Sequence, residues 1–171
     1  MTTKTVITQT VTNRLRIPPQ NLESEMALLG SIMLRPEALY DIVDIINPDS
    51  FYSEKHRIIF DTMMELFTKR APIDLLSVSS KLKEKGGLDQ IGGNTYLTEI
   101  VNVVPSSANI AYYAEIVQKK YMMRRLIEAS DHISQIGYDE TKELEEMLDN
   151  AEKKLFDVTN TRPKVGGPRK D

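Results

Sequence analysis

The sequence predicts an all-α protein, with a compact globular head of five or six helices followed by an antiparallel helical hairpin. Apolar residues recur every three or four positions over most of the 171 residues, which is the period of an α-helix. Clusters of proline, glycine and asparagine interrupt this pattern, as turns between helices do. Residues 107–136 contain neither proline nor glycine, so this stretch is expected to form one long helix or two nearly continuous helices.

The first two helices of the head have recognisable start and stop signals. Asn21 is a favoured N-cap, and Glu23 and Glu25 follow in a first turn, where the helix dipole favours negative charge. A second helix is expected to begin at Pro36 and to end at Asn47, because the proline after Asn47 disfavours helical geometry there. The apolar residues expected to face the core are Leu22, Met26, Leu29, Met33, Leu39, Ile42, Val43 and Ile46.

Three further helices complete the predicted head. Ser53 is expected to cap a third helix over residues 54–70, and Asp74 a fourth helix that ends at a glycine-containing loop. Asn94 is expected to cap a fifth helix that ends near Pro105. Their apolar stripes consist of Ile59, Met63, Leu66 and Phe67, then Leu75, Leu76, Val78 and Leu82, then Tyr96, Leu97, Ile100 and Val101.

The last part of the chain has the spacing of paired helices. After a stop and restart at Gly137 and Asp139, apolar residues are separated by four, three, four and three positions, which is typical of a coiled-coil seam. The seam residues are Leu144, Leu148, Ala151, Leu155 and Val158, and their expected partners are Leu126, Ser130, Ile133 and Gly137. A two-helix hairpin has no interior of its own, so we expect its remaining apolar surface to contact another chain. The candidate self-association residues are Leu126, Ile133, Leu144, Leu148, Ala151 and Leu155.

The predicted organisation has four parts: a flexible arm over residues 1–16, the head over 17–118, the hairpin over 119–158 and a linker or tail over 159–171. Cysteine is absent, which excludes disulfides and thiolate metal sites. No apolar run approaches the roughly 20 residues that cross a bilayer, and the first residues lack the apolar stretch of a signal peptide. Cytoplasmic localisation is therefore predicted.

One glycine-containing segment raises the question of nucleotide binding. In KGGLDQIGGNTYL, Gly87 and Gly92 have the spacing of the phosphate-binding loop GxxxxGK[ST]. Gly93 stands where that loop needs its lysine, and Asn94 stands where it needs its hydroxyl. We therefore expect no nucleotide site here, and instead expect Gly86 or Gly87 to end one helix in the left-handed conformation.

No other cluster points to a catalytic, cofactor-binding or metal-binding residue. His56 and His132 lie on different predicted helices and outside any metal-ligand spacing such as HExxH. The acidic segment 139–157 lacks the glycine and alternating ligands of a calcium loop. We interpret both histidines as structural or surface residues and the acidic segment as a solvated helix face.

Charge is distributed unevenly along the predicted hairpin. Residues 139–157 contain eight acidic and three basic side chains, whereas residues 115–125 contain four basic residues and one acidic residue. The four basic residues are Lys119, Lys120, Arg124 and Arg125. We interpret the asymmetry as a determinant of antiparallel pairing and of contacts between chains. The alternative is a local module that binds single-stranded nucleic acid through these cations, although the net charge of −3 provides no overall attraction to nucleic acid.

Five segments follow one another in a distinctive order: RIPPQNLESEMALLGSIML, FYSEKHRIIFDTMMEL, PIDLLSVSSKL, IGGNTYLTEIVNVVPSSANIAYYAEIV and RRLIEASDHISQIGY. Together they resemble the N-terminal domain of the bacterial replicative DNA helicase, the DnaB family, from Arg16 to Val158. The resemblance implies a non-catalytic helical head and hairpin, which in the full family precedes a linker helix and a RecA-like ATPase domain. ATP and Mg²⁺ would belong to that later domain, and this chain is expected to be no enzyme on its own.

The resemblance also implies partners in DNA replication. In this family, six N-terminal domains pair through their hairpins into a trimer of dimers, a collar that docks the helicase-binding domain of primase. The matching docking positions are Tyr96, Ile127, Ile133 and Glu23. The implied partners are the chain itself, from dimer to hexamer, then primase and a helicase loader, with at most weak DNA contact and no membrane. A stand-alone regulator that mixes into helicase rings is an alternative, which a reading frame continuing into GxxxxGK[ST] would exclude.

Overall fold

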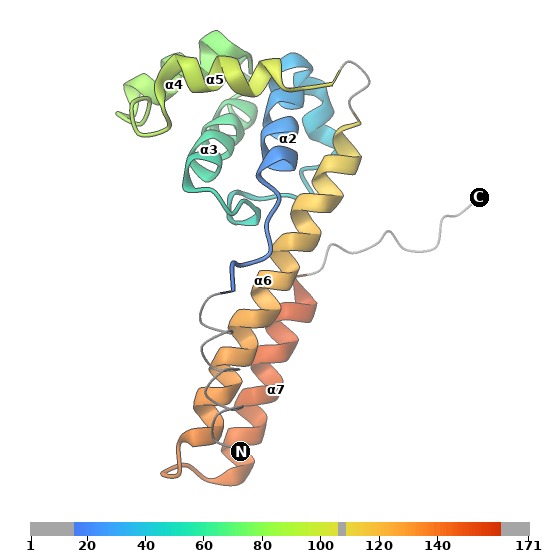
Figure 1. Cartoon of the computed structure of the whole chain (residues 1–171), viewed down its shortest axis with the longest axis vertical. Helices are drawn as coiled ribbons and strands as arrows, with labels where there is room; N and C mark the ends of the chain where they lie inside the picture. The colour runs from blue at the N-terminus through green and yellow to red at the C-terminus, as the bar shows by residue number, and fades with distance from the viewer. Residues whose placement is uncertain (1–15, 106–108, 162–171) are drawn as a thin grey trace, which may run out of the picture.

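The computed structural model describes residues 16–105 and 109–161, and within these ranges every regular element is helical, as the sequence predicts. The elements are α2 (Leu22–Leu34), the 3-10 helices η1 (Pro36–Asp41) and η2 (Pro48–Ser50), α3 (Glu54–Thr68), α4 (Leu75–Glu84), α5 (Gly93–Asn102), α6 (Ile110–Tyr138) and α7 (Leu144–Asn160). Figure 1 shows the head as a cluster of helices from which α6 extends, with α7 returning beside it. The predicted arm up to residue 15 and the predicted tail from residue 162 lie outside the described residues.

The predicted N-cap positions of α2, α3 and α4 are confirmed, whereas the predicted cap at Asn94 is wrong. The Oδ1 atom of Asn21 accepts a hydrogen bond from the Ser24 backbone N–H at 2.9 Å, and Asp74 Oδ1 accepts one from the Ser77 N–H at 2.8 Å. Ser53 precedes α3 but its side chain makes no capping bond. Asn94 lies inside the first turn of α5, where its side chain bonds Ser79 on α4, because the left-handed Gly92 takes the N-cap position.

The glycine loop is a connector between α4 and α5. Gly86 has a φ of 76°, and the N–H of Gly87 donates to the Leu82 carbonyl at 2.8 Å, which closes α4 in the way expected of a C-terminal glycine. Gly92 and Gly93 also have positive φ values, of 101° and 71°. The left-handed helix end predicted from the sequence is therefore confirmed at Gly86.

The second predicted helix is shorter and tighter than expected. Instead of an α-helix from Pro36 to Ile46, the chain forms η1 and then a series of turns. Ile42, Val43 and two further isoleucines crowd this segment with β-branched side chains, which disfavour a continuous α-helix. Leu39 and Ile42 are nevertheless fully buried, so the segment still covers the core as the apolar pattern predicts.

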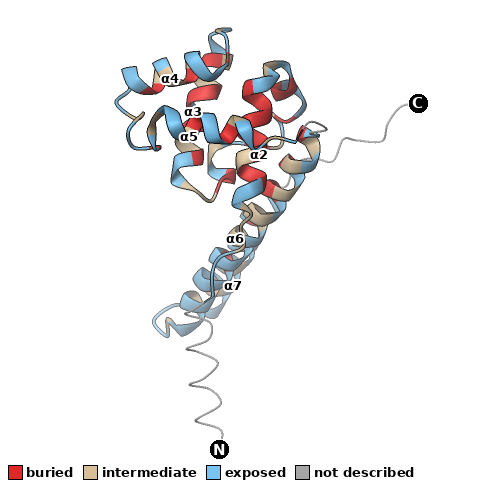
Figure 2. Ribbon diagram, turned by 45° about the horizontal axis from the view of Figure 1, so that its top comes forward, coloured by how far each residue is buried: buried red, intermediate tan, exposed pale blue. Residues whose placement is uncertain are grey.

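The core of the head is organised around α2, which packs against α3, α5, α6 and η1. Leu28, Leu29 and Ile32 of α2 have no exposed surface, and every residue from Ala27 to Met33 is buried. A helix that is enclosed on nearly all sides has to be apolar around most of its circumference. Figure 2 shows the buried residues concentrated in the head, whereas most of the hairpin is exposed.

Gly30 allows the closest approach within this core, and we expect Gly30→Ala to destabilise the chain. A Cβ atom at this position would lie 2.5 Å from the Ile100 carbonyl oxygen and 2.4 Å from Val104 Cγ2. Separating α2 from α5 to relieve the clash should cost about 1 to 3 kcal/mol, the usual range for overpacking. Urea unfolding followed by circular dichroism measures the change. Gly137→Ala on α6 is the control, because a Cβ there meets nothing within 4 Å, and an equal effect of both variants would contradict the expectation.

The hairpin pairs α6 with α7, and its seam contains Ile133, Ala151 and Val158 as predicted, but not the predicted leucines. The residues with reduced exposure are Ala129, Ile133 and Ile136 on α6 and Met147, Ala151 and Val158 on α7. The predicted seam residues Leu126, Leu144, Leu148 and Leu155 are 53%, 64%, 51% and 47% exposed. The apolar surface of α7 is wider than one contact line, and α6 covers only the edge that contains Met147, Ala151 and Val158. The first half of α6 belongs to the head, because it packs against α2, η1 and η2.

Candidate functional site

Within residues 16–105 and 109–161 there is no group of three or more histidine, cysteine, aspartate or glutamate side chains placed to hold a metal ion. The same ranges contain no helix long and apolar enough to cross a membrane. His56 is buried in the head and His132 is exposed on the hairpin. The remaining candidates for a site are hollows and exposed apolar surfaces.

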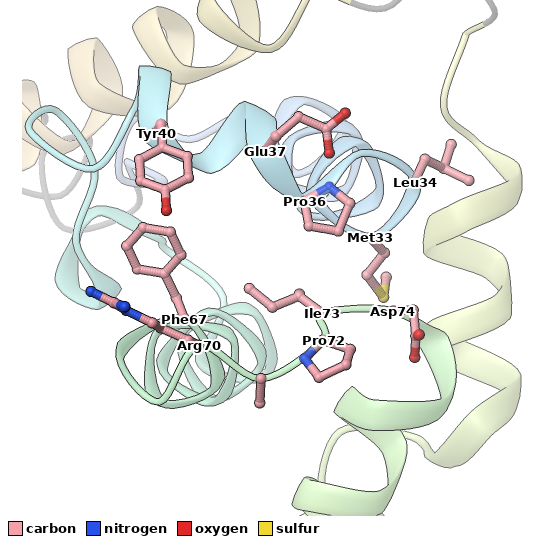
Figure 3. A pocket seen from close by; sticks show the side chains of 11 residues that line it. Met33, Leu34, Pro36, Glu37, Tyr40, Phe67, Arg70, Pro72, Ile73 and Asp74 are labelled. Carbon is pink, nitrogen blue, oxygen red and sulfur yellow. The ribbon is translucent and has the colours of Figure 1, made fainter.

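A hollow of about 620 Å³ lies on the head between the end of α2, η1 and the end of α3 (Figure 3). Its lining is mainly apolar, and the ring of Tyr40 packs edge-on against Phe67 with centroids 5.0 Å apart. Glu37, Arg70 and Asp74 are its charged residues. None of the residues singled out from the sequence as docking candidates lines this hollow.

A second hollow, of about 760 Å³, follows the junction between head and hairpin. We call it the junction groove. Its lining consists of Arg16, Ile17, Pro18, Asp49, Phe51, Tyr52, Arg57, Tyr121, Arg124, Ile127, Glu128, Ser130 and Asp131. Ile127 of α6, one of the predicted docking residues, is 46% exposed and contributes to this groove.

Arg124 braces the junction groove by joining the hairpin helix to the head. Its Nη1 donates to the Pro19 carbonyl at 2.7 Å and its Nη2 to the Ser50 carbonyl at 3.0 Å. The guanidinium also lies 5.4 Å from the ring centroid of Tyr52 and 5.8 Å from that of Tyr121. Burial lowers the pKa of Arg124, although a guanidinium stays charged at any pH at which the protein is folded. Arg124 is thus a structural cation, and its contacts with the head were not predicted from the sequence.

A buried polar network connects three helices of the head. Glu25 on α2 and His56 on α3 are each 1% exposed, and Glu25 Oε1 lies 2.8 Å from His56 Nδ1. The same carboxylate accepts hydrogen bonds from the N–H groups of Tyr52 at 2.9 Å and Ser53 at 3.3 Å. The other ring nitrogen of His56, Nε2, is 2.5 Å from the hydroxyl of Tyr96 on α5. Tyr96, a predicted docking residue, is therefore half-buried, and its hydroxyl is hydrogen-bonded to the buried His56.

The four predicted docking residues do not share one pocket. Tyr96 lies on α5 over the buried network, Ile127 lines the junction groove, and Ile133 is half-buried on the side of α6 that faces α7. Glu23 is exposed and lines a third hollow of about 410 Å³, together with Tyr112 and other residues.

The exposed leucines of the two hairpin arms lie on one side of the hairpin. Successive helical residues are rotated by about 100°, so Leu126 lies about 60° from Ala129, and the three leucines of α7 lie about 60 to 100° from Met147. Because α6 and α7 are antiparallel, the rotation of Leu126 on α6 and that of the three leucines on α7 place all four side chains on the same side of the hairpin. We call the surface formed by Leu126, Leu144, Leu148 and Leu155 the hairpin face. Phe156 is also exposed, but by the same geometry it points away from α6.

The described residues therefore form an all-α domain with an exposed apolar hairpin face and an arginine-braced groove at the base of the hairpin. The chain belongs to the family of DnaB-like helicase N-terminal domains, because the model of that family matches residues 17–119. The resemblance identified in the sequence is therefore confirmed, and the chain corresponds to the N-terminal, non-ATPase part of the helicase.

Individual relatives agree with this assignment. The chain is 43% identical over 147 residues to the replicative DNA helicase DnaC of Bacillus subtilis (strain 168). The aligned region covers 86% of the chain and 32% of that protein. The solved N-terminal domain of DnaB helicase from Mycobacterium tuberculosis superposes with a TM-score of 0.78 at 35% identity, over 82% of this chain and 99% of that one. A DnaB-like replicative helicase solved in a study of its interactions with primase superposes with a TM-score of 0.72 at 27% identity, over 86% of this chain and 33% of that one. The chain thus spans a third or less of the length of the curated relatives it matches.

Proposed function

We propose that this chain is the assembly and docking domain of a bacterial replicative DNA helicase, acting in the cytoplasm at the replication fork. Its hairpins would pair chains into dimers and then into the collar of a hexamer, and its head and hairpin base would dock primase. In this proposal ATP and Mg²⁺ are bound by the ATPase domain of the full-length family, and a helicase loader is a further partner. The observation that carries the proposal is the exposed apolar hairpin face.

Self-association through the hairpin face has a physical basis in both area and charge. Four leucines that are about half exposed on one side of a two-helix hairpin are apolar surface that a second chain can remove from water. The basic cluster around Lys119 and Lys120 lies at the base of the hairpin, whereas Glu140, Glu145 and Glu146 lie near its tip. No ion pair joins α6 to α7 among the described residues.

The charge layout favours one arrangement of the dimer. We expected the opposite charges of the two arms to attract each other within one hairpin, but Glu140, Glu145 and Glu146 lie near the tip, whereas Lys119 and Lys120 lie at the base. Two hairpins packed tip to base would bring each acidic tip against the basic base of the other chain. Parallel packing would instead place like charges together, which is unfavourable. An antiparallel pair is therefore the proposed dimer.

Docking of primase is proposed at the junction groove and at Tyr96. The DnaB-like relative that superposes at 27% identity was solved in a study of its interactions with primase, which makes primase the partner to consider first. Ile127 is an exposed apolar residue beside Arg124 and Tyr121 in a groove. Apolar, aromatic and arginine side chains in such a setting are typical of binding hot spots.

We expect Ile127→Asp to weaken binding of the primase helicase-binding domain by about 30-fold, since loss of a hot-spot residue costs about 2 kcal/mol or more. Isothermal titration calorimetry measures the affinity, and light scattering and thermal melting should show an unchanged oligomer and stability. Leu76→Asp is the matched control, because Leu76 is 77% exposed on α4, away from the junction groove. If both variants bind primase like the parent chain, docking does not use the junction groove.

The competing nucleic-acid module predicts a different result. Arg124 already donates to two backbone carbonyls of the head, so it is a poor candidate for phosphate contact. We therefore expect single-stranded DNA to bind weakly and to dissociate as salt rises from 50 to 200 mM, because few cations remain to displace counterions. Fluorescence anisotropy with a labelled 20-nucleotide strand measures this. Binding that survives 200 mM salt would favour the nucleic-acid module over the assembly domain.

A further inference from the structure

The buried network of Glu25, His56 and Tyr96 contains an ionisable imidazole, that of His56. This imidazole takes part neither in the proposed self-association nor in the pairing of α6 with α7. His56 is 1% exposed, and the ring of Phe51 packs against it edge-on with centroids 6.4 Å apart. Both ring nitrogens are nonetheless engaged, one by the Glu25 carboxylate and one by the Tyr96 hydroxyl. Of the three side chains, only that of Tyr96 reaches the surface.

The hydrogen-bond chemistry of these groups fixes the position of one proton. An ionised carboxylate only accepts hydrogen bonds, so Nδ1 of His56 carries a proton and donates it to Glu25. In the neutral ring, Nε2 has only a lone pair, and the Tyr96 hydroxyl must donate its hydrogen inward. In the imidazolium form Nε2 donates as well, the Tyr96 oxygen accepts, and the hydroxyl hydrogen is free to be donated elsewhere.

We infer that His56 is a positioning residue of the docking surface, whose protonation decides whether Tyr96 meets a partner as a hydrogen-bond acceptor or as a donor. The inference rests on the proposed function, in which Tyr96 contacts primase. With His56 charged, the Tyr96 hydroxyl can donate to an oxygen acceptor on the partner, and the complex takes up one proton at His56.

Charged groups of both signs lie around Tyr96, so the acceptor on the partner is specified only as an oxygen. Lys55 Nζ lies 4.8 Å from the centroid of the Tyr96 ring, and the imidazolium would add a second positive charge behind the hydroxyl. Burial raises the pKa of Tyr96, with smaller contributions from Glu99 and Glu25, so the hydroxyl keeps its hydrogen near neutral pH. Beyond the direct partner Glu25 on α2, the charged neighbours of the network are Lys55 on α3, Glu99 on α5 and Arg124 on α6, which interacts electrostatically with Glu25.

Calorimetric titration of this chain with the primase helicase-binding domain tests the inference. We expect binding to tighten by at least about threefold between pH 8 and pH 6, where imidazole side chains change their charge, since uptake of a full proton gives about tenfold per pH unit. Titrations in buffers of different ionisation enthalpy should detect proton uptake. Tyr96→Phe removes only the hydroxyl, so it should abolish both the uptake and the tightening without unfolding the chain.

The second histidine supplies the control. The sequence contains only His56 and His132, and His132 is exposed on the hairpin, so His132→Gln should keep the full pH dependence. Imidazole ¹⁵N chemical shifts should also show more doubly protonated His56 in the complex than in the free chain at the same pH.

The outcomes separate this inference from the proposed function. Unchanged affinity in Tyr96→Ala removes Tyr96 from the docking surface and overturns this inference, whereas docking at the junction groove is overturned only by unchanged affinity in Ile127→Asp. Weakened affinity in Tyr96→Ala combined with a pH dependence that persists in Tyr96→Phe overturns only the role of His56, and leaves the docking proposal standing.

Discussion

Replacing Leu148 and Leu155 together by alanine is expected to abolish self-association at micromolar concentration while leaving helical content and melting temperature nearly unchanged. Both leucines are about half exposed in the single chain, at 51% and 47%, so shortening them leaves little cavity behind. In an antiparallel dimer, each chain would contribute both leucines to the interface. Burying a leucine fully is worth about 1.5 to 3 kcal/mol, so the four truncations should raise the dissociation constant roughly 100-fold or more.

Light scattering across a concentration series measures this change directly. Phe156→Ala is the matched control, because Phe156 is a larger residue on the same helix, 62% exposed, and lies about 100° around α7 from Leu155. The control should assemble like the parent chain. If the leucine variant also assembles like the parent, or if Phe156→Ala dissociates equally, the hairpin face is not the dimer interface and the collar proposal loses its main support.

The hairpin illustrates which part of a helical fold can be predicted from periodicity. The spacing of Leu144, Leu148, Ala151 and Leu155 correctly predicts one amphipathic helix, and the restart after Gly137 correctly predicts its antiparallel return. The same spacing cannot tell which edge of the apolar surface meets α6 and which edge remains exposed. Contacts within a chain and contacts between chains use the same residue types with the same period. The leucines expected in the seam were therefore found on the outside.

The head illustrates a different limit. Glu23 and Glu25 are two acidic residues in the first turn of α2, and the helix dipole accounts equally well for both. The structure separates them, because Glu23 is exposed whereas Glu25 is buried against His56, which is 31 residues later in the chain. Only the packing of α3 against α2 distinguishes them, and no local pattern encodes that packing. The contacts of Arg124 with Pro19 and Ser50 were missed for the same reason.

This difference between two neighbouring glutamates leads to the second large expected effect. Glu25→Ala should destabilise the chain by about 3 to 5 kcal/mol, because removing one member of a buried polar pair leaves the other without its partner. The N–H groups of Tyr52 and Ser53 would also lose their acceptor. For a chain of this size the loss corresponds to a decrease in melting temperature of about 10 °C.

Comparing Glu25→Ala with Glu23→Ala isolates burial as the cause, since both changes remove a negative charge from the same helix turn. Glu23→Ala should shift the urea midpoint very little, because Glu23 is exposed and makes no hydrogen bond or ion pair among the contacts described. Glu25→Gln should lie between the two, because the amide oxygen can still accept one backbone N–H while its NH₂ group faces the N–H donors that the carboxylate satisfies. Equal urea midpoints for Glu23→Ala and Glu25→Ala would contradict this expectation. They would mean that both side chains stabilise the chain through the dipole of α2 and not through the buried network, and that packing alone fixes His56 and Tyr96.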